Sequence, residues 1–251
     1  MGFSFVRPDS EIWLARAGAT DAAIADAPVA VAVLRADYER WSRWALGVVA
    51  LALAVTGAVL TPIMIGAVQE WPGPLGLVDG IVLVGSPAAA ALGAFLLVRL
   101  WRTGRRLTSA AAWWTALPYR SGAARPSAIG WWQARAVNLE PRILVRLVTG
   151  ACAFLLALFG FSPALRMLIE GMREGQRAFT VGMTVAGAIA FAAACGQCGG
   201  VLRLVRGLSA GDPVWRRIAG GGDGRRSAVR RRLRPRHSRA RAGFPRKEDR
   251  R

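Results

Sequence analysis

Four long apolar stretches dominate this sequence, at residues 44–68, 75–98, 147–165 and 178–202. Each is near or above the ~20 residues of helix that cover the ~30 Å hydrocarbon core of a bilayer. Backbone groups in lipid must form hydrogen bonds within their own segment, so these stretches predict helices. We therefore expect an all-α polytopic membrane protein with four transmembrane helices arranged as two hairpins.

The apolar stretches divide the 251-residue chain into five parts and leave no room for a second large soluble domain. The parts are an N-terminal arm with a partly amphipathic helix (1–43), a first hairpin (44–98), a basic and aromatic link (99–146), a second hairpin (147–202) and an arginine-rich tail (203–251). In the link, two short helices broken near Pro118 and Pro126 are expected to lie flat at the membrane interface.

The basic residues indicate how the spans are oriented. Of the 34 lysines and arginines, 31 lie in the arm, the link and the tail, and three lie between the third and fourth spans. Basic residues near span ends stay on the cytoplasmic side, so both termini are expected to be cytoplasmic. The abundance of Arg, Ala, Gly and Val is typical of a GC-rich bacterial genome, which suggests a bacterial inner membrane.

The tail carries much of the net charge of +19, because residues 225–251 hold 13 basic residues against Glu248 and Asp249. Such a segment cannot bury a core and is expected to be disordered. Attraction to anionic lipid, at ~1 kcal/mol per basic residue near the surface, is its first expected use. Salt-sensitive contact with nucleic acid is less favoured. A third interpretation is unselected sequence, of the kind that a GC-rich gene gives in a shifted reading frame.

Rows of small residues predict how the spans pack, because helices in lipid approach closely where small side chains recur every four residues. The rows are Gly85, Ala89 and Gly93 in the second span and Ala188, Ala192, Gly196 and Gly200 in the fourth. We expect spans two and four to pack back to back at the centre of the bundle, with little space for a wide pore.

The two hairpins resemble each other at an offset of about one hundred residues. Thr61-Pro62 in span one recurs as Ser162-Pro163 in span three. Pro62 and Pro163 are expected to kink their helices, with the neighbouring hydroxyl bonding the carbonyl that proline frees. The pattern indicates either a parallel internal repeat or a chance alignment of apolar segments, and the sequence favours neither.

Tryptophans are expected to anchor the chain in the lipid bilayer, because aromatic side chains gather at membrane interfaces. The predicted lipid-facing anchors are Trp41, Trp44, Trp71, Trp101, Trp113, Trp114, Trp131 and Trp132.

Cys195 and Cys198 form the sharpest local pattern, because Cys-x-x-Cys on a helix places two thiols about one turn apart. Cys152 has a similar predicted depth, so the three thiols form a candidate redox or metal cluster. The pair nevertheless lies in the inner half of its span, and cysteine suits a row of small residues. Packing is the favoured interpretation, and redox or metal chemistry is the alternative.

The sequence shows no recognisable catalytic, metal or cofactor motif. We therefore expect a non-enzymatic scaffold or accessory subunit that requires no cofactor and engages a protein partner or anionic lipid headgroups through its cytoplasmic arms. A transporter or channel component is the first alternative, and a membrane thiol oxidoreductase that uses Cys195 and Cys198 is the second. An oligomer is compatible with this composition.

Overall fold

The computed structural model describes residues 4–20, 22–70, 73–74, 76–125, 127, 132, 140–171 and 176–212. Their regular structure is helical: α1 (Pro8–Arg16), α2 (Ala27–Tyr38), α3 (Trp41–Glu70), α4 (Leu77–Arg120), α6 (Pro141–Glu170) and α7 (Arg177–Leu208), with short 3-10 turns η1 (Ile24–Asp26) and η3 (Ser209–Gly211). The predicted anchors Trp71 and Trp131 and the tail beyond residue 212 lie outside the described residues.

Four of the helices, α3, α4, α6 and α7, are long and apolar enough to cross a membrane. Large apolar side chains point outward from them, including Ile81, Leu155 and Phe159, each more than 60% exposed. An outward face of this kind is suited to lipid rather than water. The structure thus confirms the predicted all-helical, multi-pass membrane protein.

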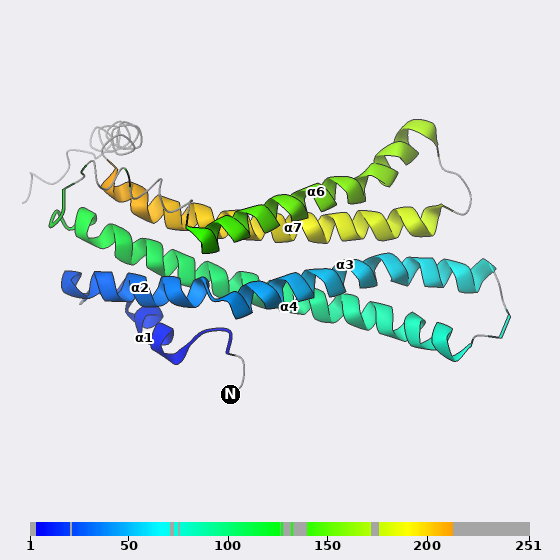
Figure 1. Ribbon diagram of the computed structural model, residues 1–251, viewed down its shortest axis with the longest axis horizontal. Helices are drawn as coiled ribbons and strands as arrows, with labels where there is room; N and C mark the ends of the chain where they lie inside the picture. Colours follow the sequence, from blue (N-terminus) through cyan, green and yellow to red (C-terminus); the bar gives the residue numbers. More distant parts are fainter. Residues whose placement is uncertain are drawn as a thin grey trace, which may run out of the picture.

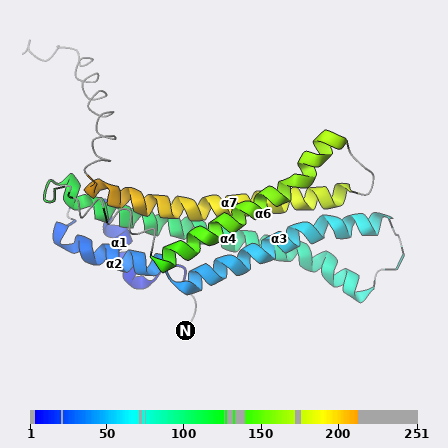
Figure 2. The same ribbon diagram turned by 45° about the horizontal axis from the view of Figure 1, so that its top comes forward.

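The long helices run side by side and define two ends of the bundle (Figure 1). At the turn end, α3 ends and α4 begins, and α6 ends and α7 begins. At the arm end, α1 and α2 lie against the last turns of α4 (Figures 1 and 2). The end of α2 reaches α7 at Tyr38, beside Gly200. Both α4 and α7 extend past their predicted spans. The bundle is therefore much longer at the arm end than hydropathy indicates.

The contact between α3 and α4 is made backbone to backbone at glycine. A Cβ on Gly93 would lie 2.5 Å from the Ala50 carbonyl oxygen and 2.6 Å from the Ala54 nitrogen. Ser86 is buried in the same interface, whereas Gly85 is exposed and a Cβ there would meet nothing within 4 Å. With 3.6 residues per turn, a spacing of seven keeps one face while a spacing of eight rotates by ~80°. The predicted row therefore meets α3 through Gly93 but not through Gly85.

Helix α7 is the central element, and its small residues serve three neighbours. A Cβ on Gly182 would lie 2.9 Å from the Val59 carbonyl oxygen of α3, and one on Gly187 would lie 3.1 Å from the Gly160 carbonyl carbon of α6. Gly207 similarly faces α4. The prediction of a central pair formed by spans two and four is thus corrected to one central helix with three partners.

Only part of the predicted row on α7 faces neighbouring helices. Gly200 is buried and Gly196 half-buried, while Ala188 and Ala192 are exposed. The opposite faces of α7 are also lined with glycine and alanine, so a row of small residues alone does not identify the contacting face. In α4, Ala89 is half-buried.

Pro62 and Pro163 both lie inside helices, as predicted. The hydroxyl groups of the preceding Thr61 and Ser162 donate to different carbonyls relative to the proline. Ser162 Oγ donates to the Phe159 carbonyl at 2.8 Å, which is the acceptor that Pro163 leaves without an amide donor. Thr61 Oγ1 instead donates to the Gly57 carbonyl at 2.6 Å, one residue before the carbonyl that Pro62 frees. Toward the turn end, α6 leans away from α7 (Figure 1).

The arm end contains a second packed core, which we call the arm subdomain: α1, α2, residues 104–120 of α4, and residues 201–211. Its core consists of Ala27, Ala30, Leu34, Tyr38, Leu107, Ala110, Ala111, Trp114 and Leu204. Trp114 is fully buried, and its Nε1 donates to the Trp13 carbonyl at 3.2 Å. Trp113 packs on this core, with its ring edge-to-face on Trp114.

The arm subdomain corrects two predictions for the link. Residues 101–120 are not separate interfacial helices but the continuation of α4. Trp114 is not a lipid-facing anchor, and Trp113 packs against protein. An amphipathic helix has the same 3.6-residue period whether its apolar face meets lipid or another helix, so the pattern alone did not distinguish the two.

Candidate functional site

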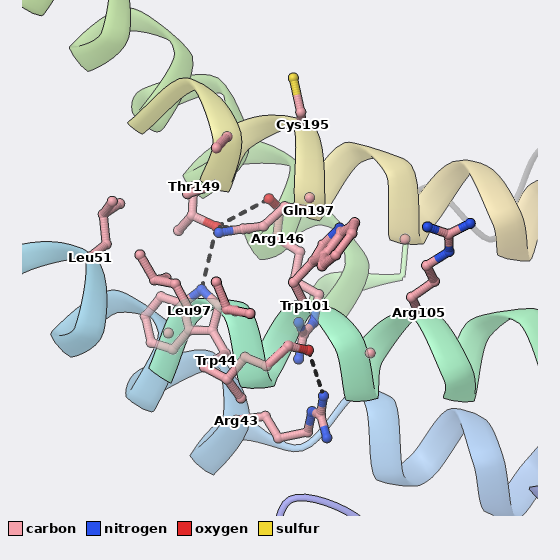
Figure 3. Close-up of a pocket in the computed structure, with 18 of the residues that line it drawn as sticks. Arg43, Trp44, Leu51, Leu97, Trp101, Arg105, Arg146, Thr149, Cys195 and Gln197 are labelled. Atoms are coloured by element: carbon pink, nitrogen blue, oxygen red, sulfur yellow. Dashed lines mark hydrogen bonds between the residues drawn. The ribbon is translucent and has the colours of Figure 1, made fainter. Parts of the chain in front are cut away.

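A cavity of about 690 Å³ lies where the arm subdomain joins the four long helices. We call it the basic pocket, because the described residues that line it include Arg43, Arg105, Arg146 and Arg203 and no aspartate or glutamate. Residues from α2, α3, α4, α6 and α7 contribute to its walls (Figure 3). Elements far apart in the sequence thus converge on one concave, positively charged site.

Arg43 is a buried cation at the start of α3, only 4% exposed. Its Nη2 donates to Thr103 Oγ1 at 2.9 Å and to the Leu100 carbonyl at 3.2 Å, while Nη1 donates to the Phe5 carbonyl. These acceptors are neutral, so they fix the guanidinium in place without cancelling its charge. The same contacts fasten the N-terminal segment to α4.

Arg146 is the second buried cation, at 9% exposure, and belongs to α6. Its Nη2 donates to the Tyr38 carbonyl at 2.7 Å, and its guanidinium carbon lies 4.6 Å from the centroid of the Tyr38 ring. This cation–π geometry holds the charge against an aromatic face. The ring fits beside α7 because residue 200 is glycine, where any Cβ would collide with the Tyr38 hydroxyl.

The carboxylates nearest to the pocket in sequence form ion pairs with arginines outside its lining, although the buried Asp37 is near enough to act electrostatically on Arg43. Asp37 pairs with Arg40, and Glu39 and Glu140 pair with Arg35. Among the described residues, none of the four pocket arginines has a carboxylate within ion-pair distance. A buried cation without an anion is costly unless polar groups surround it. The basic pocket therefore has a net positive field that an anion would neutralise.

A short chain of polar side chains crosses the pocket between α3, α6 and α7. Trp44 Nε1 donates to Thr149 Oγ1 at 3.4 Å, and Thr149 Oγ1 is 2.9 Å from Gln197 Oε1 (Figure 3). With its oxygen facing Thr149, the Gln197 amide has two N–H donors that make no hydrogen bond to the described residues. The pocket thus offers neutral donors beside its cations.

The basic pocket has an apolar end and a basic end. Leu51, Leu97 and Ile189 line the part nearer the turn end, whereas Arg105 and Arg203 line the part nearer the arm subdomain. Figure 3 shows Leu51 and Arg105 on opposite sides of the cavity. A ligand that fills it would need an anionic group and an apolar group.

The three cysteines do not form a cluster with metal-ligand geometry in the described part of the chain. Cys152 and Cys195 are exposed and Cys198 is half-buried, and all three are free thiols. Cys195 is on the pocket wall, but its sulfur points away from the cavity in Figure 3. Cys198 packs near Gly150, with its sulfur 3.5 Å from the position of a Cβ there.

The remaining predicted anchors take different positions. Trp41, Trp101 and Trp132 are 51%, 45% and 62% exposed, respectively. Trp44 and Trp101 also line the basic pocket. The pocket arginines, Tyr38 and Gln197 were not predicted as site residues from the sequence. The available signal was Gln197, an amide within an apolar span.

Comparison with protein-family models, curated proteins and solved structures finds no match to this chain.

Proposed function

We propose that this chain is a non-enzymatic accessory or scaffold protein of a bacterial inner membrane, with both termini in the cytoplasm. The orientation rests on the distribution of basic residues. Of the 34, 31 lie in the N-terminal arm, the link and the tail, which all fall on the same side of the membrane if the four helices span it. The arm subdomain would then project from the cytoplasmic face, with the basic tail beside the anionic leaflet.

The arm subdomain is the observation that carries this proposal. Its core is shared between α1, α2, α4 and α7, and two of these helices continue directly from the spans. A surface built on continuous helices is held at a fixed height and orientation relative to the bilayer, as a scaffold for a partner requires. Ile12 and Val29 are 60% and 56% exposed on this subdomain, and each is available to a protein partner.

The partner can be sought by site-specific photocrosslinking in native membranes. A benzoylphenylalanine at Ile12 or Val29 should produce a protein adduct of defined mass. The matched control is Leu168, which is 79% exposed on α6 near the turn end and should crosslink to lipid alone. Protein adducts of equal yield at all three positions, or none at Ile12 and Val29, would rule out the arm subdomain as the partner surface.

The orientation has its own test in intact cells. In a background with Cys152, Cys195 and Cys198 replaced by alanine, a single cysteine at Glu70 should react with an impermeant maleimide. A cysteine at Ser109 should react only after the cells are permeabilised. Both positions are exposed, at opposite ends of the bundle. The reverse pattern of labelling would invert the topology.

A further inference from the structure

We propose that the basic pocket binds the phosphate headgroup of an anionic membrane lipid, with an acyl chain along its apolar wall. This goes beyond the scaffold function and does not depend on it, because the inference requires only that the arm end of the bundle meets a bilayer surface. A phosphate group is present both in a lipid headgroup and in free phosphate. The apolar wall favours the lipid, because only a lipid has an acyl chain to cover it.

The charge pattern identifies the ligand as an anion. Four arginines line the cavity, and among the described residues no carboxylate lies within ion-pair distance of any of them. Guanidinium groups bind phosphate oxygens through paired, charge-assisted hydrogen bonds. Arg146 has five N–H donors, of which one is bound by the Tyr38 carbonyl. A side-chain hydrogen bond with Tyr38 engages a further donor, and the donors that remain can serve a phosphate.

The binding groups are already in place. Arg43 is fixed by Thr103 and Arg146 by Tyr38, so neither guanidinium must be ordered when a ligand arrives. The Gln197 amide, oriented by Thr149, adds neutral donors to the same cavity. Preorganised donors reduce the entropy lost on binding, which favours affinity.

The depth of the site matches a lipid headgroup. Arg43 and Arg146 immediately precede the apolar stretches of α3 and α6, where the membrane–water interface is expected. From there, Leu51, Leu97 and Ile189 continue the cavity toward the hydrocarbon region. A free phosphate ion would leave this wall unfilled, whereas an acyl chain would cover it. Lipid-binding sites in membranes are expected in basic pockets of this kind between helices.

Native mass spectrometry of the full chain in a non-ionic detergent tests the proposal. The probes are phosphatidylglycerol, the zwitterionic phosphatidylcholine, and inorganic phosphate. We expect one phosphatidylglycerol retained per chain, at an affinity at least tenfold above that for phosphatidylcholine. Inorganic phosphate at millimolar concentration should not displace it.

Two charge-matched double variants locate the site. Arg105→Gln with Arg203→Gln removes the two more accessible pocket arginines. It should lower the phosphatidylglycerol affinity at least about tenfold, the factor expected from the loss of a single charge-assisted hydrogen bond. Arg102→Gln with Arg106→Gln removes two exposed α4 arginines outside the pocket and should change it less than about twofold. Thermal melting in detergent checks that both variants remain folded.

Three results would overturn the inference. Equal losses in the two double variants would show non-specific attraction to surface charge. Displacement by inorganic phosphate would assign the pocket to a free anion. Equal retention of phosphatidylglycerol and phosphatidylcholine would remove the role of the arginines.

Discussion

Replacing Trp114 with alanine is expected to lower the free energy of unfolding by about 3–5 kcal/mol, the usual cost of truncating a large buried aromatic side chain. Trp114 is fully buried in the arm subdomain and packs edge-to-face against Trp13 and Trp113. The change would leave a cavity between α1, α2 and α4, and would also free the Trp13 carbonyl. Thermal and denaturant unfolding in detergent, followed by circular dichroism, would measure the loss.

The control for this prediction is Trp132→Ala, because the Trp132 side chain is 62% exposed. It removes the same number of atoms and should change stability by less than about 1 kcal/mol, as most exposed substitutions do. If the two variants melt alike, the packed core assigned to the arm subdomain is wrong.

Gly93→Ala and Gly85→Ala are expected to have opposite effects on stability, although both add one methyl group to α4. At Gly93 the new Cβ would meet the backbone of α3 at 2.5 Å, so the helices must separate. The expected cost is about 1–3 kcal/mol, typical of overpacking. At Gly85 the Cβ meets nothing within 4 Å, and alanine has the higher helix propensity, by about 1 kcal/mol.

Melting temperatures of the two variants in the same detergent would check the contrast. A destabilised Gly85→Ala with an unchanged Gly93→Ala would mean that α4 presents the other face to α3.

The four spans could be predicted because each one is a single continuous segment of about twenty apolar residues. The continuation of α4 to Arg120 could not, since beyond the span its stability comes from Trp114 and Leu107 packing against α2. Helical period shows that one face of such a segment is apolar, but not what covers it. The rows of small residues predicted the contacts at Gly93 and Gly200 but not the whole contacting faces. In α7 this is because glycine and alanine occur on every side of the helix.

The basic pocket could not be predicted from the sequence, because the residues that line it are far apart in the chain. Arg43 and Arg146 lie in different hairpins, and each is ordinary when considered alone as a basic residue at the end of a span. Only the fold shows that both point inward, and that Asp37, Glu39 and Glu140 are already paired with other arginines. That no carboxylate occurs among the described lining residues depends on which side chains the fold brings together, which the sequence does not show.

Helix α4 contains 44 residues in one continuous rod, about 66 Å long at 1.5 Å per residue. Roughly half of it is needed to cross a bilayer. Transmembrane helices adjust their tilt when bilayer thickness changes, so the lipid around the turn end sets the angle of the whole rod. A tilt of ~5° moves a point 33 Å from the pivot by ~3 Å, with the pivot near mid-helix. Trp114 belongs to α4 and to the core of the arm subdomain. A change in membrane thickness would therefore shift the position of the arm subdomain relative to the bilayer.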